Sequence, residues 1–481
     1  MPLCQIPHKQ FPPQTYHDGY QYMNNITAKS PKTIPRDWTQ GSVIRNLVFL
    51  SWPIMIHNSL YMVGQTVDMI WMGRLGSNAV AGVGAVFIVF MLVLTGKMGL
   101  ATGARAMITR SIGSGNIEQA SHLSVQAFVL SIVYGIFFTV LGVIFAHPIL
   151  TLFGLKPEVI SLGTDYMRVL FGGWIFYSIW IMAFSIMQAS GDAKTPMFIH
   201  MFTRCIQIIL SPCLIFGWWV FPEVGVAGAA FSQMIGQVLG MCISLWILFK
   251  GGQSRLKLTI KGFHIDIGSI WRMIKIGLPA LFMGVQSNLG QTVLMWIIAP
   301  YGTIAVAGHS LNQRVEMFIQ MPAVGLGTGA GILVGQNLGA EKPRQAESIG
   351  WTATALMEGF FTIFAVVVLL GAPYIMRIFT PESELINTGS DFLRIACAGY
   401  LLSGLTISLQ NSISGSGDTL PPMIISMVSV WLVLLPVAYL LPRVTDLDVY
   451  GIRWAMSISH AFSAIVYTLY FRNGKWKRKQ V

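Results

Sequence analysis

The chain has 481 residues, of which 54% are hydrophobic and only 10% are charged. Soluble domains carry about 25% charged residues, so this composition excludes an ordinary soluble protein and indicates an integral membrane protein. The formal net charge is +12, but the basic residues lie in short segments between apolar runs, where they set membrane orientation. We therefore expect a lipid bilayer and no nucleic acid as partner. The cysteines show no spacing typical of metal ligands or disulfides.

Residues 1–43 are polar and lack the apolar region of a signal peptide, and we predict a flexible tail there. Continuous apolar runs follow, each near or above the ~20 residues that a spanning helix needs. Unbroken runs are typical of helices rather than of barrel strands, so the fold class is all-α with twelve transmembrane helices. The runs cover 46–72, 79–108, 122–146, 163–187, 197–220, 226–249, 273–299, 304–333, 349–371, 389–413, 422–441 and 451–471.

Twelve spans place both termini on the same side of the membrane. If that side is the cytoplasm, the inside segments hold 21 Lys and Arg and the outside segments hold 7. Basic residues concentrate in cytoplasmic segments, so we predict cytoplasmic termini in a plasma (inner) membrane. Three more, Lys97, Arg204 and Arg314, lie within helices, and we expect Lys97 to snorkel to the cytoplasmic interface.

The segment 251–271 is basic and lies in mid-chain. It predicts a cytoplasmic linker between an N-terminal six-helix lobe, 44–250, and a C-terminal six-helix lobe, 272–471. Residues 472–481 then form a basic cytoplasmic tail.

The two lobes repeat each other at a constant offset of 226 residues. Six is an even number, so the second half enters the membrane in the same orientation as the first. Such a parallel repeat about an axis along the membrane normal is typical of alternating-access transporters. The matched pairs include Pro53 with Pro279, Gly76 with Gly302, Gly113 with Gly339, Asp165 with Asp391, Arg168 with Arg394, and Gly225 with Gly451.

Asp68 is the one acid in the first apolar run, and ionisable groups inside spans are functional by default. At 1.5 Å per residue, Asp68 lies about 9 Å, Gln233 about 10 Å and Ser211 about 15 Å from the outer face, so the three could share one site. Desolvation disfavours the charged form of a carboxyl, which suits an exchange of protons for a cationic substrate. The alternatives are a helix cap and a structural acid bonded to Gln233 and Ser211.

The second half has intramembrane charges of its own in Arg314, Glu316 and Glu358. Residues two apart do not face each other on a helix, so we expect Arg314 and Glu316 to find partners on other helices. Glu358 lies about 15 Å from the cytoplasmic face, and a structural salt bridge is its alternative role.

Six motifs carry a family resemblance: VDMIWMGRLG, RSIGSGN, MQASGDAKTPM, GVAGAA, HSLNQRVE and VGQNLGAEKPRQA. Together they resemble the multidrug and toxin extrusion (MATE) family over residues 46–471. The resemblance implies two six-helix lobes around a central cavity. It also implies efflux of organic, often cationic, compounds in exchange for Na⁺ or H⁺.

The resemblance also carries site residues over, with several carboxylates missing. The family's helix-1 acid falls on Asp68, but its acids in helices 5, 7 and 10 fall on neutral residues. This predicts H⁺ rather than Na⁺ coupling, because Na⁺ needs several oxygen ligands. The matching or neighbouring neutral positions are Gln207, Ser211, Gln233, Gln286, Ser287, Asn288 and Ser403.

We therefore predict a secondary antiporter that exports small organic compounds, as a monomer without cofactor or metal. The runner-up is a lipid-linked oligosaccharide flippase, which would favour several basic residues in its cavity. A channel or a membrane enzyme comes third, since no P-loop, metal motif or catalytic Ser/His/Asp cluster is present in the sequence.

Overall fold

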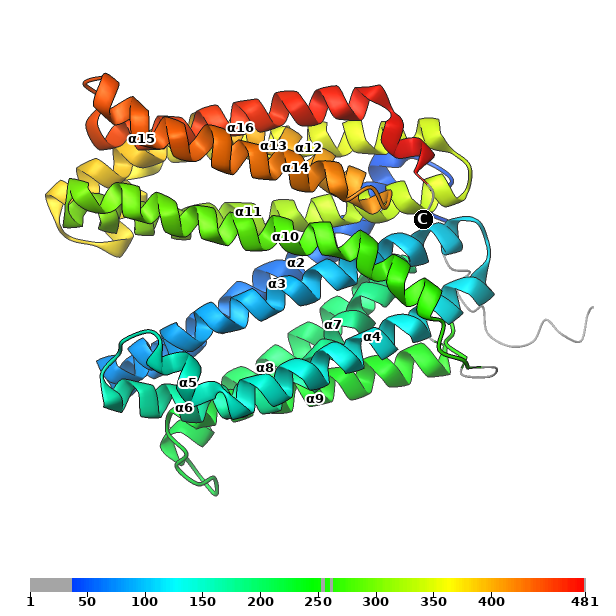
Figure 1. The fold of residues 1–481 in the computed structure, drawn as a ribbon, viewed down its shortest axis with the longest axis horizontal. Coiled ribbons are helices and arrows are strands. Elements are labelled where there is room, and N and C mark those ends of the chain that lie inside the picture. Colours follow the sequence, from blue (N-terminus) through cyan, green and yellow to red (C-terminus); the bar gives the residue numbers. More distant parts are fainter. Residues whose placement is uncertain (1–36, 252–255, 260–262, 480–481) are drawn as a thin grey trace, which may run out of the picture. The chain divides into compact units, whose positions relative to one another are not determined.

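The structure is a computed structural model that describes residues 37–251, 256–259 and 263–479. The predicted tail is outside the described residues up to position 36, as are parts of the linker and the last two residues. The described residues are helical almost throughout (Figure 1). The helices are α2 (Val43–Leu75), α3 (Ser77–Gly113), α4 (Ile117–Ile144), α5 (Ala146–Thr151), α6 (Pro157–Gly172), α7 (Trp174–Ala189), α8 (Lys194–Phe216), α9 (Val226–Lys250), α10 (Ile267–Ile298), η1 (Ala299–Tyr301), α11 (Thr303–Gly339), α12 (Pro343–Phe379), α13 (Ser383–Gly415), α14 (Leu420–Val428), η2 (Ser429–Leu434), α15 (Leu435–Val444), α16 (Asp448–Asn473) and η3 (Lys475–Arg478).

The predicted all-α fold of twelve spans in two six-helix lobes is confirmed. Among the described residues, ten helical segments are long and apolar enough to cross a bilayer alone, and α14, η2 and α15 together form one of them. The fourth span is α6 followed by α7, with a bend of 49° between them at Gly173. The twelfth, α16, is long enough, but its polar residues lower its hydropathy below that of the others.

Each lobe has its own apolar core. In the N-terminal lobe, α3, α4, α6, α7 and α9 pack around buried side chains that include Phe171 and Trp174. In the C-terminal lobe, α11, α12, α13 and α16 pack around a second set that includes Phe361 and Phe471. The second set also takes in Leu47, Leu50 and Ile54, so the first part of α2 joins the core of the C-terminal lobe.

The lobes touch closely at the end of the bundle that holds Val43, Gly113, Gly339 and the linker, called here the linker end. Backbones approach through glycine, since a Cβ on Gly103 would lie 2.2 Å from Met273 O. On the other side of the interface, α11 packs on α2 in the same way. A Cβ on Gly325 would lie 2.6 Å from the Cα of Met55. Small residues permit such contact.

The described parts of the linker pack against the N-terminal lobe. Leu256 and Leu258 are buried, and Leu258 N donates to Leu248 O at 3.0 Å. Asp266 then caps α10 by accepting from Ser269 N at 3.1 Å. The helix consequently begins at Ile267, before the predicted lobe boundary at 272.

Candidate ion-coupling and substrate sites

One face of α2 is turned into the N-terminal lobe. His57, Tyr61, Gly64 and Asp68 follow one another at spacings of three and four residues, which places them on a single side of the helix. Opposite them stands α8: a Cβ on Gly64 would lie 2.8 Å from Arg204 Nη1. The Asp68 side chain is therefore aimed at α8.

Asp68 is held by two of the three predicted partners. Gln207 Nε2 donates to Asp68 Oδ2 at 2.7 Å, and Ser211 Oγ donates to Oδ1 at 3.4 Å. Gln233 is buried nearby and lines a small pocket together with Arg204 and Gln207. The structure thus brings Asp68, Gln207 and Ser211 into contact and places Gln233 one layer further away.

The sequence predicted Asp68 as a lone charge. The structure adds a cation, Arg204, which is connected to Asp68 through Gln207. Arg204 is buried, with 5% of its surface exposed, and its Nη1 donates to Gln207 Oε1. Its Nε donates to His200 Nε2 at 3.1 Å, which makes His200 neutral because an accepting ring nitrogen carries no proton. The His200 ring lies 4.3 Å from that of His57. The spacing of Arg204 and Gln207, one helical turn apart, could have revealed this chain of bonds.

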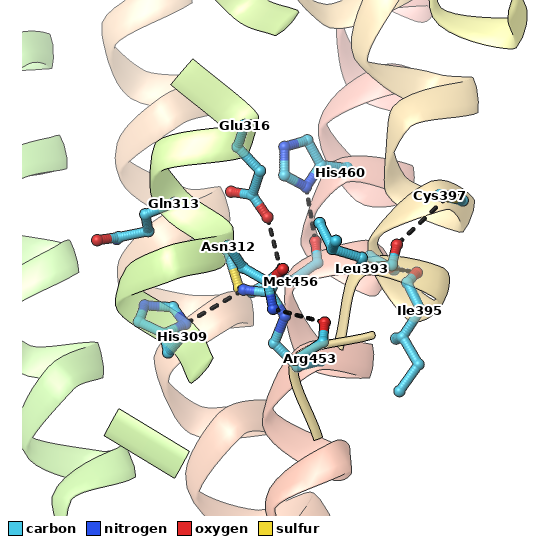
Figure 2. Close-up of polar contacts among 12 residues, drawn as sticks. His309, Asn312, Gln313, Glu316, Leu393, Ile395, Cys397, Arg453, Met456 and His460 are labelled. Carbon is cyan, nitrogen blue, oxygen red and sulfur yellow. Dashed lines mark hydrogen bonds and ion pairs between the residues drawn. The ribbon is translucent and has the colours of Figure 1, made fainter. Parts of the chain in front are cut away.

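The C-terminal lobe buries an ion pair that the sequence only half predicted (Figure 2). Arg453 Nη2 donates to Glu316 Oε1 at 2.6 Å, with 2% and 13% of the two side chains exposed. Arg453 Nη1 also donates to His309 Nδ1 at 3.2 Å. Glu316 thus pairs across helices, as predicted. Its partner Arg453 is one of the seven basic residues that the charge count places in outside segments, but it lies within α16. Arg314 is exposed on α11, away from this pair.

The other predicted residues of the second lobe lie apart from one another. Glu358 Oε1 accepts from Leu405 N of α13 at 2.7 Å. Gln286 is buried and donates to Ser426 Oγ at 2.7 Å. Ser287 and Asn288 are exposed on α10. Their positions show no single cluster in this lobe.

The prediction for Lys97 is wrong. Its side chain is fully buried between α3 and α4 and donates to Ser131 Oγ. The α3 helix runs on to Gly113, so Lys97 lies near its middle and the ammonium stays inside the lobe.

Helix α3 also carries Arg105, which is one of the 21 basic residues that the charge count places in inside segments. It lies eight positions before the end of α3 and lines a pocket between the lobes. The remaining lining residues are Thr102, Ala106, Thr109, Ala280, Met283, Thr328, Gly331, Gln410, Asn411, Ser414 and Gly415.

Two lobes of six helices, a pocket between them and buried ionisable groups define a membrane transporter. The chain belongs to the MatE family, whose model matches residues 53–213 and again 279–440. The two matches begin 226 residues apart, at Pro53 and Pro279, the offset of the repeat. The family model therefore matches each lobe separately.

The relatives are named as multidrug resistance proteins or transporters. "Probable multidrug resistance protein YoeA" of Bacillus subtilis is 27% identical, covering 95% of this chain and 98% of its own. "Probable multidrug resistance protein NorM" of Thermotoga maritima is 28% identical, and the match covers 91% of this chain and 94% of the relative. A "FAD transporter" of Shewanella oneidensis is 24% identical over 82% and 87%. These names support multidrug efflux and do not favour the flippase alternative.

Solved structures share the fold. A MOP superfamily transporter from Pyrococcus furiosus, whose structure is described by "reverse polarity of binding pocket", has a TM-score of 0.86 and 22% identity. The match covers 92% of this chain and 98% of that one. An outward-facing MATE multidrug transporter matches with a TM-score of 0.85, 23% identity, and coverage of 91% and 96%.

Proposed function

We propose that the protein is a proton-coupled antiporter that expels organic compounds, with Asp68 as the coupling residue. The observation that carries this proposal is the bonding of Asp68, a carboxylate within a span, to Gln207 and Ser211 of α8. An acid at such a depth changes its contacts when it gains a proton, because a neutral carboxyl is a weaker acceptor. The linker end, where the basic residues concentrate, is then cytoplasmic.

Protons suit the Asp68 site better than Na⁺. Sodium requires oxygen ligands, yet Gln207 points its NH₂ group at Asp68 because its oxygen accepts from Arg204. A guanidinium this close repels a metal cation, whereas a proton needs only the carboxylate. Na⁺ as the coupling ion would have to displace this arrangement.

Helix α2 connects the protonation of Asp68 to the packing between the lobes. Asp68 contacts α8 in the last third of α2, while Met55, which lies nearer the linker end of α2, packs on Gly325 of the other lobe. Weakening the contact with α8 would let α2 shift relative to its own lobe. That shift changes the packing that closes the linker end.

The experiment is transport in proteoliposomes with imposed gradients. A panel of fluorescent compounds of each charge class, such as ethidium, riboflavin and fluorescein, is loaded and its efflux followed. An inward H⁺ gradient should drive efflux, and an inward Na⁺ gradient at fixed pH should not. Efflux driven by Na⁺ alone would contradict proton coupling. The same panel tests the cationic substrates that the sequence predicts.

The remaining predictions concern the location, the membrane topology and the oligomeric state of the protein. Plasma-membrane location, cytoplasmic termini and a monomeric state stay proposals. Cysteines placed in the described linker, for example at His264, should react with impermeant reagents only after the cytoplasmic side is opened.

A further inference from the structure

The pocket between the lobes lies where the two repeats meet. The repeat offset of 226 converts Thr102 into Thr328, and both line this pocket. It also converts Arg105 into Gly331, and both of these line it too. A pocket lined by two such equivalent pairs lies on the axis that relates the lobes. Both lobes therefore contribute a threonine to the lining, but only the N-terminal lobe contributes a charged residue, Arg105, at the position where the C-terminal lobe has Gly331.

Arg105 is the charged member of the lining, and no acid balances it among the described residues. Its side-chain bond within hydrogen-bonding distance is Nη2 to Thr102 Oγ1 at 3.4 Å, inside its own helix. No Asp or Glu is found among the residues that line the pocket. Two buried guanidiniums among the described residues differ, since Arg453 is paired with Glu316 and Arg204 is bonded to Gln207 and His200.

The neighbouring hydroxyls leave the guanidinium as the strongest donor in the pocket. Thr102 donates to Met98 O at 3.0 Å and Thr328 donates to Val324 O at 2.9 Å. Their protons are thus used within their own helices. A ligand that enters meets unpaired N–H groups of Arg105, which form a planar fork suited to carboxylate or phosphate.

A second cation, Arg314, lies on the side of α11 that carries Thr328 of the pocket. Arg314 is exposed, and fourteen residues separate it from Thr328 in the pocket. Fourteen residues are close to four helical turns, so Arg314 and Thr328 share one face. The acid two positions away, Glu316, is already paired with Arg453. Arg314 therefore adds one positive charge to this face of α11, about 21 Å from Thr328 along the helix.

We propose that the inter-lobe pocket binds an anionic group, a carboxylate or phosphate, of the exported compound. The inference rests on the proposed efflux function and names its substrate class as organic anions. Arg105 of the N-terminal lobe binds the anion, while the amide of Gln410 on the other lobe completes the site with the second N–H that its bond to Met283 Sδ leaves. A bound substrate then bridges the two lobes that must move apart for release.

The test is a binding titration with two flavins that share one chromophore. Riboflavin is neutral and flavin mononucleotide carries a phosphate, so their ratio of dissociation constants isolates the charge. We expect the purified protein to bind the mononucleotide on the order of tenfold to a hundredfold more tightly, as for a charge-assisted bond. Arg105→Gln should bring the ratio near one, and Arg105→Lys should keep part of it.

Lys275→Gln is the matched control. It removes the same charge from an exposed site on α10 that does not line the pocket, and it should leave the ratio unchanged. Equal binding of both flavins by the native protein, tighter binding of ethidium, or an unchanged ratio in Arg105→Gln would overturn the inference. If Arg105→Gln does not fold, the native ratio and Arg105→Lys decide.

Two further arms separate the sources of failure. In nanodiscs, displacement of bound flavin mononucleotide by phosphatidylglycerol but not by riboflavin would assign the pocket to a lipid headgroup. That result would overturn the inference. Proton-driven efflux that persists without any preference for the phosphate would leave the transport proposal intact. A preserved preference without proton-driven efflux would refute the coupling and leave the pocket assignment intact.

Discussion

Replacing Asp68 by asparagine separates its charge from its shape. The amide oxygen can still accept from Gln207, and the amide nitrogen can donate to Ser211, which now contact the carboxylate at 2.7 and 3.4 Å. We therefore expect Asp68→Asn to insert and fold but to lose efflux driven by an H⁺ gradient, because it has no group to protonate.

The magnitude follows from the bonds. A hydrogen bond to a charged acceptor contributes roughly 1.5–3 kcal/mol and a neutral one roughly 0.5–1.5 kcal/mol. The variant should thus lose about 1–2 kcal/mol at Gln207. Part of that is offset because a neutral group costs less to bury. Arg204→Gln should cost a similar amount, since it leaves Gln207 without its donor.

A double variant tests whether Asp68 and Arg204 act together. If Gln207 joins them electrostatically, the pair of substitutions should cost less than the sum of the two, by about 0.5–3 kcal/mol. The measurement is thermal unfolding in detergent, with proteoliposome efflux in parallel. Strict additivity would refute the bridged pair. Asp68→Asn that transports at the native rate would falsify the coupling role.

Four other outcomes are expected. Efflux by the native protein at fixed pH should not change when Na⁺ is replaced by K⁺, as measured by dye release; a clear Na⁺ dependence would contradict the proton site. Glu316→Gln should destabilise the C-terminal lobe by about 3–5 kcal/mol, because it leaves Arg453 buried without its charge partner, while Glu316→Leu with Arg453→Met should recover most of the melting temperature. Lys97→Met should keep or raise the melting temperature, since it removes a buried ammonium, and native-like efflux in this variant would agree with a structural role. Gly103→Val should separate the lobes at the linker end, where a Cβ meets Met273 O at 2.2 Å. Faster labelling of a cysteine at Ser51 would report that opening, and an unchanged rate would argue against it.

The sequence predicted the fold well because its signals are long. Each span extends over many apolar residues, and the repeat offset is preserved from Pro53 to Gly451. Depth along a helix follows from counting residues, which brought Asp68 to the level of Ser211. Direction around the helix follows from spacing, which kept Arg314 and Glu316 apart.

The errors arose where a side chain could point either way. Lys97 and Arg453 were placed by their distance from a helix end, yet both turn into a lobe and find partners there. Arg105 and Arg453 lie within the predicted runs 79–108 and 451–471. Because each is close to the end of its run, the charge count placed it with the neighbouring loop, whereas the structure places it inside a helix. Pairing across helices depends on packing angles that one sequence does not specify.

One proton is too little to drive the whole cycle. Shifting two lobe arrangements from 1:99 to 99:1 requires about 5.5 kcal/mol of differential binding. Neutralising Asp68 alters one charge-assisted bond to Gln207, worth roughly 1.5–3 kcal/mol. The remainder must come from elsewhere, and a substrate held by Arg105 against the other lobe is placed to supply it. An antiporter carries one ligand at a time, so the proton favours one lobe arrangement and the substrate favours the other, and their opposed effects together span this difference. We therefore expect the Arg105→Gln variant to lose tight coupling: a pH gradient should still act on Asp68, but the proton flux measured per exported molecule should change.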